Sequence, residues 1–146
     1  MNQAEKEVQC FNDGFTCSQA LLSIYGPQFG LDQKIALKLA TPFGAGMGRM
    51  AKTCGAVTGA FMVLGLKFGR ATLEDTEAKG KTYELVKEFA DRFKVRNGSV
   101  VCKELIGYDI GIPEELEAAQ DEDVFETLCP KLVKSAAELV EDMLSS

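Results

Sequence analysis

Signals that begin and end helices recur along the whole chain, and they constrain the fold more than any other feature of the sequence. Thr16 is a residue type that caps helix N-termini, and Pro130 is favoured as a first helical residue. The pair Gly26-Pro27 is typical of a helix end. The only strand-like alternation is a short one over residues 34–39. The pattern therefore predicts an all-α fold.

The spacing of apolar residues and caps predicts about six to seven helices in a compact bundle. With 146 residues the chain fits a single domain, residues 1–146, that can bury roughly two-thirds of the surface exposed by its unfolded form. Helices are expected over residues 2–11, 17–25, 33–41, 54–67, 73–95 and 130–144, with further starts near 99 and 113 and a flexible glycine loop over 44–48.

The N-terminus and the longest apolar stretch bear on the location of the protein. Residues 1–9 are polar and acidic, so no signal peptide is expected, and the cytoplasm is the default location. The apolar stretch over residues 55–66 is shorter than the roughly 20 residues that a spanning helix needs. We therefore expect a buried core helix there and no membrane insertion.

Charge is distributed unevenly around Cys54. Residues 33–73 contain six basic residues and no acidic one, whereas the whole chain has a net charge of −6. The basic segment is either a local field that favours a thiolate or a set of solvated side chains screened by salt. The chain is acidic overall and has no basic stripe interleaved with aromatic residues, so nucleic-acid binding is not expected.

Four of the five cysteines fall where helices are expected to begin. These are Cys17, Cys54, Cys102 and Cys129. A helix start presents free N–H groups and a partial positive charge, both of which stabilise a thiolate. Cys10 lies toward the end of its helix and is left out of the candidate site. In a reducing compartment such cysteines are catalytic, metal-binding or inert rather than a disulfide framework.

The residue types leave three functions open. The chain has no histidine, so a metal would need thiolate or carboxylate ligands, and no paired C-x-x-C spacing is present. The first hypothesis is thiol redox chemistry, with Cys54 or Cys17 attacking and a neighbouring cysteine resolving. The second is a four-thiolate metal or iron–sulfur centre for electron transfer, and the third is an interaction module with inert cysteines.

Several segments carry a resemblance to a known family. They are Gly14 to Ala20, Phe43 to Gly48, Cys54 to Ala60, Gly98-Ser99 with Cys102, and Cys129. In these segments the chain resembles the redox-active proteins named for a C_GCAxxG_C_C signature, although its order is Cys-Gly-Ala where the signature has Gly-Cys-Ala.

The resemblance implies that the four cysteines at the helix starts are the functional ones, and Cys10 matches no signature position. A related domain occurs in split-Soret cytochromes, where an iron–sulfur site has been proposed. The haem-attachment motif C-x-x-C-H is absent, so covalent haem is not expected. No cofactor, substrate or redox partner is fixed by the resemblance, and a homodimer stays open.

Two expectations concern the geometry and reactivity of the cysteines. If Cys17, Cys54, Cys102 and Cys129 share a function, their sulfurs must approach one another despite their wide sequence separation. Cys54 is expected to be the most acidic thiol. The reasons are its helix start, the nearby Arg49 and Lys52, and small neighbours that leave its sulfur accessible.

Overall fold

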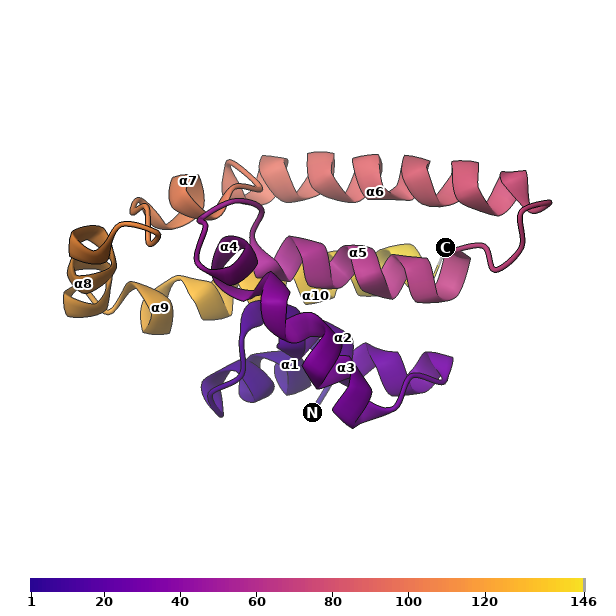
Figure 1. Cartoon of the computed structure of the whole chain (residues 1–146). Coiled ribbons are helices and arrows are strands. Elements are labelled where there is room, and N and C mark those ends of the chain that lie inside the picture. Colours follow the sequence, from indigo (N-terminus) through magenta and orange to yellow (C-terminus); the bar gives the residue numbers. More distant parts are fainter. Residues whose placement is uncertain (146) are drawn as a thin grey trace.

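The chain folds into helices joined by short connections (Figure 1), and a computed structural model describes residues 1–145. These residues contain no strand, so the all-α prediction is confirmed. The helix count is slightly higher than predicted because several segments are only one turn long. In chain order the elements are α1 (Gln3–Asn12), α2 (Cys17–Tyr25), η1 (Gly26–Phe29), α3 (Gln33–Ala40), η2 (Thr41–Phe43), α4 (Gly44–Gly48), α5 (Gly55–Phe68), α6 (Thr76–Asn97), α7 (Cys102–Ile106), α8 (Pro113–Asp121), α9 (Val124–Thr127) and α10 (Cys129–Leu144).

Helix caps explain several of these boundaries. Thr16 caps α2 as predicted: its hydroxyl accepts the N–H of Gln19, while the Gln19 side chain accepts the N–H of Thr16. α10 begins at Cys129 rather than at Pro130, with Leu128 as its cap residue. The alternating segment 34–39 lies within helix α3, which Asp32 caps. Helix signals therefore outweigh the short alternation.

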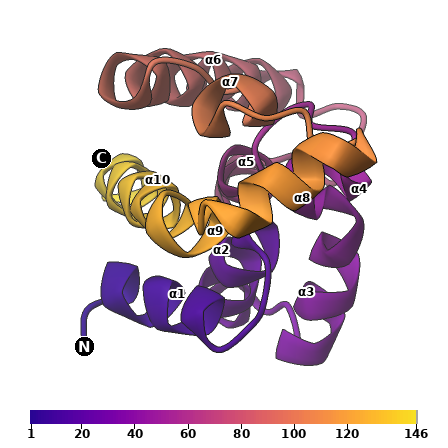
Figure 2. The ribbon, with the colours of Figure 1, turned by 90° about the vertical axis from the view of Figure 1, so that its left-hand side faces the viewer.

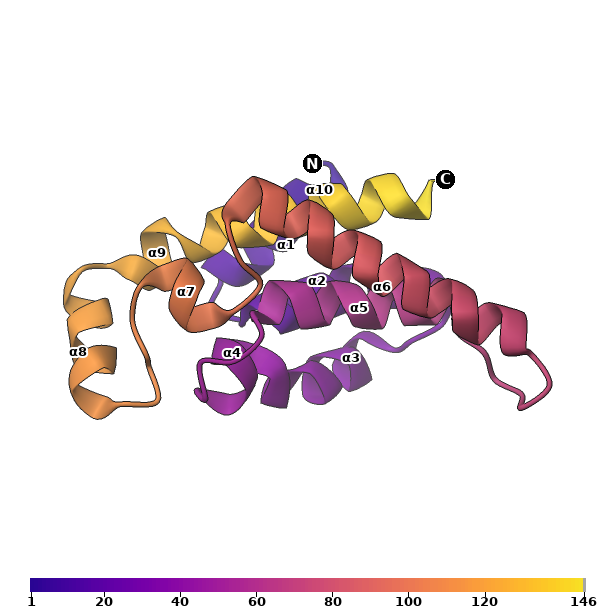
Figure 3. The ribbon, with the colours of Figure 1, turned by 90° about the horizontal axis from the view of Figure 1, so that it is seen from above.

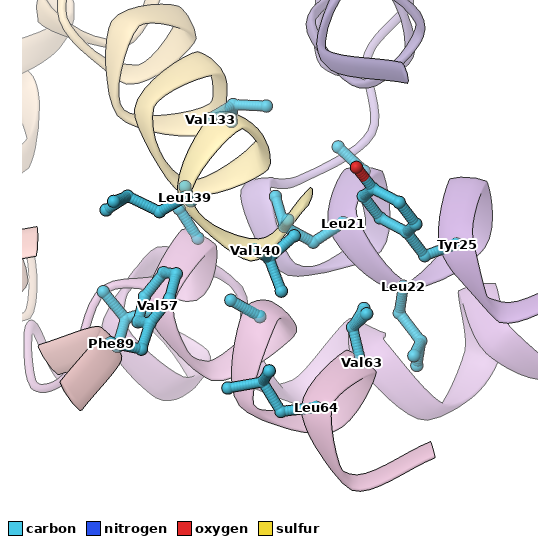
Figure 4. Close-up of a cluster of buried hydrophobic side chains, with 14 of the residues drawn as sticks. Leu21, Leu22, Tyr25, Val57, Val63, Leu64, Phe89, Val133, Leu139 and Val140 are labelled. Atoms are coloured by element: carbon cyan, nitrogen blue, oxygen red, sulfur yellow. The ribbon is translucent and has the colours of Figure 1, made fainter. Parts of the chain in front are cut away.

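The core lies between α2, α5, α6 and α10. α6 and α10 flank α5 on one side, and α2 and α3 lie on the other (Figures 2 and 3). Figure 4 shows the side chains that meet there, with Leu21, Leu22 and Tyr25 from α2, Val57, Val63 and Leu64 from α5, Phe89 from α6, and Val133, Leu139 and Val140 from α10. All of these side chains are at most 2% exposed, so α5 is the buried core helix that its sequence predicted. Among residues 1–145, no helix is both long and apolar enough to cross a lipid bilayer.

Glycines let α5 approach α2 closely. A Cβ built on Gly59 would lie 2.7 Å from the Leu21 Cβ and 3.1 Å from the Ser18 Cα. A Cβ on Gly55 would lie 3.3 Å from the Cys17 Cβ. The bare helix face therefore brings the start of α5 against the start of α2.

The glycine loop over residues 44–48 is a left-handed turn, which differs from the flexible loop that we predicted. Ala45, Gly46 and Met47 all have φ between 56° and 66° with positive ψ. Ala45 and Met47 have side chains that disfavour this conformation by roughly 1–2 kcal/mol each. The N–H of Lys52 donates to the carbonyl of Gly46 at 2.9 Å and helps to fix the turn.

The short helices lie at one end of the molecule. α4, α7, α8 and α9 lie together at this end, at the left of Figure 1. α5 and α10 both begin there and α6 ends there, as Figure 3 also shows. The helix starts that carry cysteines therefore meet at the same end of the bundle.

Candidate thiol site

A short antiparallel contact places Cys54 beside Cys102. Thr53 and Val101 form an isolated bridge, the N–H of Cys54 donates to the carbonyl of Val100 at 2.8 Å, and the N–H of Cys102 donates to that of Lys52 at 2.6 Å. The segments that lead into α5 and α7 therefore run side by side. This fixes the two cysteines at adjacent helix starts, although 47 residues separate them along the chain.

The close packing of α2 against α5, and of α4 against the start of α7, completes the arrangement. The start of α2 lies against the start of α5, where Gly55 faces the Cys17 side chain. A Cβ on Gly46 would lie 2.7 Å from the Cys102 Cβ and equally close to the backbone of Ala51. Gly46 therefore has two constraints, because its φ is +65° and it leaves no room for a side chain beside Cys102.

Cys17, Cys54, Cys102 and Cys129 all line one cavity of about 140 Å³. The thiols of Cys129 and Cys54 interact with the Cys17 thiol and contribute to its raised pKa. The other three cysteines are 4–8% exposed, and all are free thiols. The structure thus brings together the four cysteines that the sequence singled out. The Cys54 sulfur is buried rather than accessible, so reagents can reach it only through the cavity.

The pKa of Cys54 is lowered, chiefly because the Cys17 thiol donates a hydrogen bond to its sulfur. Burial opposes this shift, and the backbone N–H groups of Ala56 and Val57 at the start of α5 add to it. These N–H groups act on the sulfur without forming a cap hydrogen bond of the usual geometry. The helix start therefore lowers the pKa of Cys54, as the sequence predicted. The main contribution comes from a neighbouring thiol rather than from Arg49 or Lys52.

Two neighbouring thiols have raised pKa values. Hydrogen bonds to Cys129 and Cys54, together with burial, raise the pKa of Cys17 well above its usual range. Burial, followed by electrostatic interactions with Cys54, Cys129 and Asp109, raises the pKa of Cys102 to about 12. Cys54 is therefore favoured as the thiolate, while Cys17 and Cys102 stay protonated at neutral pH.

Cys10 lies outside this cavity. Its sulfur is 3.6 Å from the Ser23 hydroxyl, between α1 and α2. Burial raises its pKa, with smaller opposing and reinforcing effects from Ser23, Asp13 and Glu7. Its exclusion from the candidate site therefore agrees with its position in the structure.

The apolar wall of the cavity was not predicted from the sequence. Aromatic and aliphatic side chains from several segments surround the sulfurs, including Phe11, Phe15, Leu105, Ile110 and Phe125. Phe15 is 41% exposed, so the wall reaches the surface. In the sequence, the only indication of this wall is Phe15, which directly precedes the capping Thr16 and Cys17.

The arrangement does not fit a preformed metal site. Within residues 1–145, no three Cys, Asp or Glu side chains are placed to hold one metal ion. The four sulfurs are the right donors for a soft metal or an iron–sulfur cluster. They instead line an apolar cavity as free thiols.

A second buried ionisable group lies away from the cysteines. Glu7 on α1 is fully buried, and neither of its carboxyl oxygens has a hydrogen-bond partner in the described part of the chain. Burial, with a contribution from Glu141 on α10, raises its pKa to about 10. The Tyr25 hydroxyl donates to Glu141 at 3.2 Å nearby. Glu7 follows Ala4 at helical spacing, so both lie on the buried face of α1. The burial of Glu7 was not predicted from the sequence.

Together, the fold and the cavity define an all-α protein whose four cysteines, each at or next to a helix start, share one apolar site. The chain belongs to the family described as "Putative redox-active protein (C_GCAxxG_C_C)", which matches residues 15–143. The match covers every segment on which the resemblance rested, apart from Gly14. No curated protein and no solved structure matches the chain.

Proposed function

We propose that the four-cysteine cavity carries out thiol–disulfide exchange, with Cys54 as the attacking thiolate and Cys17 as the resolving thiol. The observation that carries the proposal is that Cys17 and Cys54 line one cavity at two helix starts that pack together, where the Cys17 thiol lowers the pKa of Cys54. This arrangement pairs the most acidic thiol of the site with an adjacent protonated one. Attack by a thiolate and resolution by a neighbouring thiol is how disulfides exchange.

In the first step, the Cys54 thiolate attacks one sulfur of a substrate disulfide RS–SR. A Cys54–SR mixed disulfide forms, the RS–SR bond breaks, and RS⁻ leaves. The pKa of Cys54 is lowered, so a larger fraction of this thiol is in the reactive form at neutral pH.

In the second step, Cys17 attacks the sulfur of Cys54. Cys17 gives its proton to the RS⁻ released in the first step and forms the Cys17–Cys54 disulfide. The Cys54–SR bond breaks, and the second RS⁻ leaves and takes a proton from solvent. The substrate disulfide is reduced to two thiols, and the protein loses two thiols. Cys129 lines the same cavity and contributes to the raised pKa of Cys17, so it offers a second sulfur for passing the disulfide on. Return to the dithiol state requires a thiol reductant as redox partner.

The test is redox equilibration of the native chain with mixtures of reduced and oxidised dithiothreitol. A Cys10→Ser background removes the one thiol outside the cavity. After acid quenching and alkylation, peptide mass spectrometry should find a reversible Cys17–Cys54 disulfide, which Cys54→Ser abolishes. A chain that forms no reversible disulfide among the four cysteines would refute the proposal.

The two other hypotheses give different results in parallel measurements. Iron and zinc analysis of anaerobically purified protein should find less than one metal per chain. Stoichiometric metal that disappears in each of the four Cys→Ser variants would replace thiol exchange by a metal centre. Uniformly slow alkylation of all native thiols in the reduced, metal-free protein would favour inert cysteines.

A further inference from the structure

Apart from the Cys54 thiolate, the wall of the cysteine cavity carries no charged side chain. Apart from the four cysteines, the only polar side chain that lines it is Thr16. The Thr16 hydroxyl already contacts the Ser18 hydroxyl at 3.3 Å and the Gln19 amide oxygen at 3.2 Å. The wall therefore offers an incoming molecule aromatic and aliphatic carbon and thiol sulfur.

Such a wall discriminates against charge. An ion that enters loses its hydration, and this is unfavourable unless a paired group replaces the water. The only charge on the wall is that of the Cys54 thiolate, which is consumed when the mixed disulfide forms, and the negative charge of Asp109 lies close enough to raise the pKa of Cys102. Carboxylates on a substrate would meet both this charge and the Cys54 thiolate.

The size of the cavity sets a second limit. At about 140 Å³ it is close to the ~150 Å³ of an apolar cavity, lined by Leu, Ile and Phe, that holds one benzene molecule. One six-membered ring therefore fits beside the sulfurs. A peptide-sized group does not.

We infer that the site takes small, uncharged disulfides whose organic group is apolar and no larger than about one aromatic ring. This inference rests on the proposed thiol–disulfide exchange and names its substrate class. The Cys54 thiolate attacks the substrate disulfide, Cys17 resolves the mixed disulfide, and the substrate leaves as two thiols. Charged disulfides of amino acids and peptides are poor substrates for this cavity.

Three disulfide probes test the selectivity. 4,4′-Dithiodipyridine is uncharged at pH 7, 5,5′-dithiobis(2-nitrobenzoate) carries two carboxylates, and cystamine carries two ammonium groups. Rates on the native Cys10→Ser chain are divided by rates on the same chain unfolded in urea, which removes the intrinsic reactivity of each probe. The normalised rate should be at least tenfold higher for the uncharged probe than for either charged one.

Cystamine separates selectivity of the cavity from the effect of net charge. The chain carries −6, so long-range repulsion alone would slow the dianionic probe and speed the dicationic one. Equal normalised rates for all three probes, or a cystamine rate that matches the uncharged probe, would overturn the inference.

A pair of lysine variants locates the effect. Phe125 lines the cavity, whereas the adjacent Glu126 is exposed and does not line it. Phe125→Lys should raise the normalised rate of the dianionic probe about tenfold or more and lower that of the uncharged probe. Glu126→Lys changes the net charge by twice as much and should leave the ratio of the two rates within about twofold. A larger effect of Glu126→Lys would contradict a cavity-based selectivity, and thermal unfolding checks that both variants fold.

The outcomes also separate this inference from the proposed function. If no probe forms a mixed disulfide on Cys54, thiol exchange itself fails. If all probes react at Cys54 with equal normalised rates, thiol exchange stands and the substrate class is wrong.

Discussion

At the scale of single residues, the acidity of Cys54 depends on its neighbour. The Cys17 thiol lies at the start of α2 and donates to the Cys54 sulfur at the start of α5. A hydrogen bond to the charged form of a group lowers the pKa of that group. The Cys54 thiolate therefore requires contact between two helices.

Cys17→Ala should raise the pKa of Cys54, because it removes the thiol that donates to the thiolate. The pH midpoint of Cys54 alkylation by iodoacetamide, measured in the Cys10→Ser background, should move upward. Each pKa unit corresponds to about tenfold less thiolate at neutral pH. Burial of Cys54 slows the labelling but does not move the midpoint.

Cys17→Ser is the matched control, because a serine hydroxyl can still donate. Its midpoint should lie between those of Cys17→Ala and the parent chain. An unchanged midpoint in Cys17→Ala would show that the helix N–H groups alone set the pKa of Cys54.

Glu7 should make the stability fall as the pH rises. Its pKa is about 10 in the folded chain, against an ordinary value of 4.5. Its contribution is therefore fully present below about pH 4.5 and is lost progressively up to about pH 10. For one proton, the free energy of unfolding falls by about 1.4 kcal/mol per pH unit in this window. Urea unfolding between pH 5 and pH 8 measures the slope.

Glu7→Gln removes this titration and should flatten the slope by that amount. Glu84→Gln, on the exposed side of α6, should leave the slope as it is. Parallel slopes for the parent chain and Glu7→Gln would mean that Glu7 is ionised in the folded protein.

At the scale of elements, the close approach of α5 to α2 depends on Gly59. Gly59→Ala should destabilise the chain by about 1–3 kcal/mol, because the new Cβ would lie 2.7 Å from the Leu21 Cβ in the core. Gly65→Ala in the same helix meets nothing within 4 Å and should stabilise it by about 0.5–1 kcal/mol. Urea midpoints compare the two variants. Equal effects of both would indicate that helix propensity rather than packing decides.

The elements show what the sequence can and cannot predict. Caps and apolar spacing predict most helices, and helix starts pick out the four cysteines. The left-handed turn around Met47 could not be predicted, because its non-glycine residues disfavour that conformation and the packing of Ala45 against the buried cluster that includes Cys102 and Ile106 cannot be seen in the sequence. The Thr53–Val101 bridge is a single pair without alternation, so the sequence does not show what brings Cys54 beside Cys102.

At the scale of the whole molecule, the bundle brings distant helix starts to one end and encloses them in apolar side chains. The sequence predicts that the cysteines should meet if they share a function. It does not predict the uncharged wall, which comes from segments as distant as Phe11 and Phe125. The cavity places a thiol of lowered pKa, Cys54, beside thiols of raised pKa, Cys17 and Cys102, and this contrast supports the exchange chemistry that we propose.

The most direct measurement is mass spectrometry of the chain after reaction with 4,4′-dithiodipyridine. In the Cys10→Ser chain, the account predicts release of two thiopyridone molecules for each Cys17–Cys54 disulfide formed, with no pyridylthio group retained. In Cys10→Ser/Cys17→Ser, one pyridylthio group should remain on Cys54. An adduct on another cysteine, or its complete loss from Cys54 without Cys17, would contradict the assignment of attacking and resolving thiols.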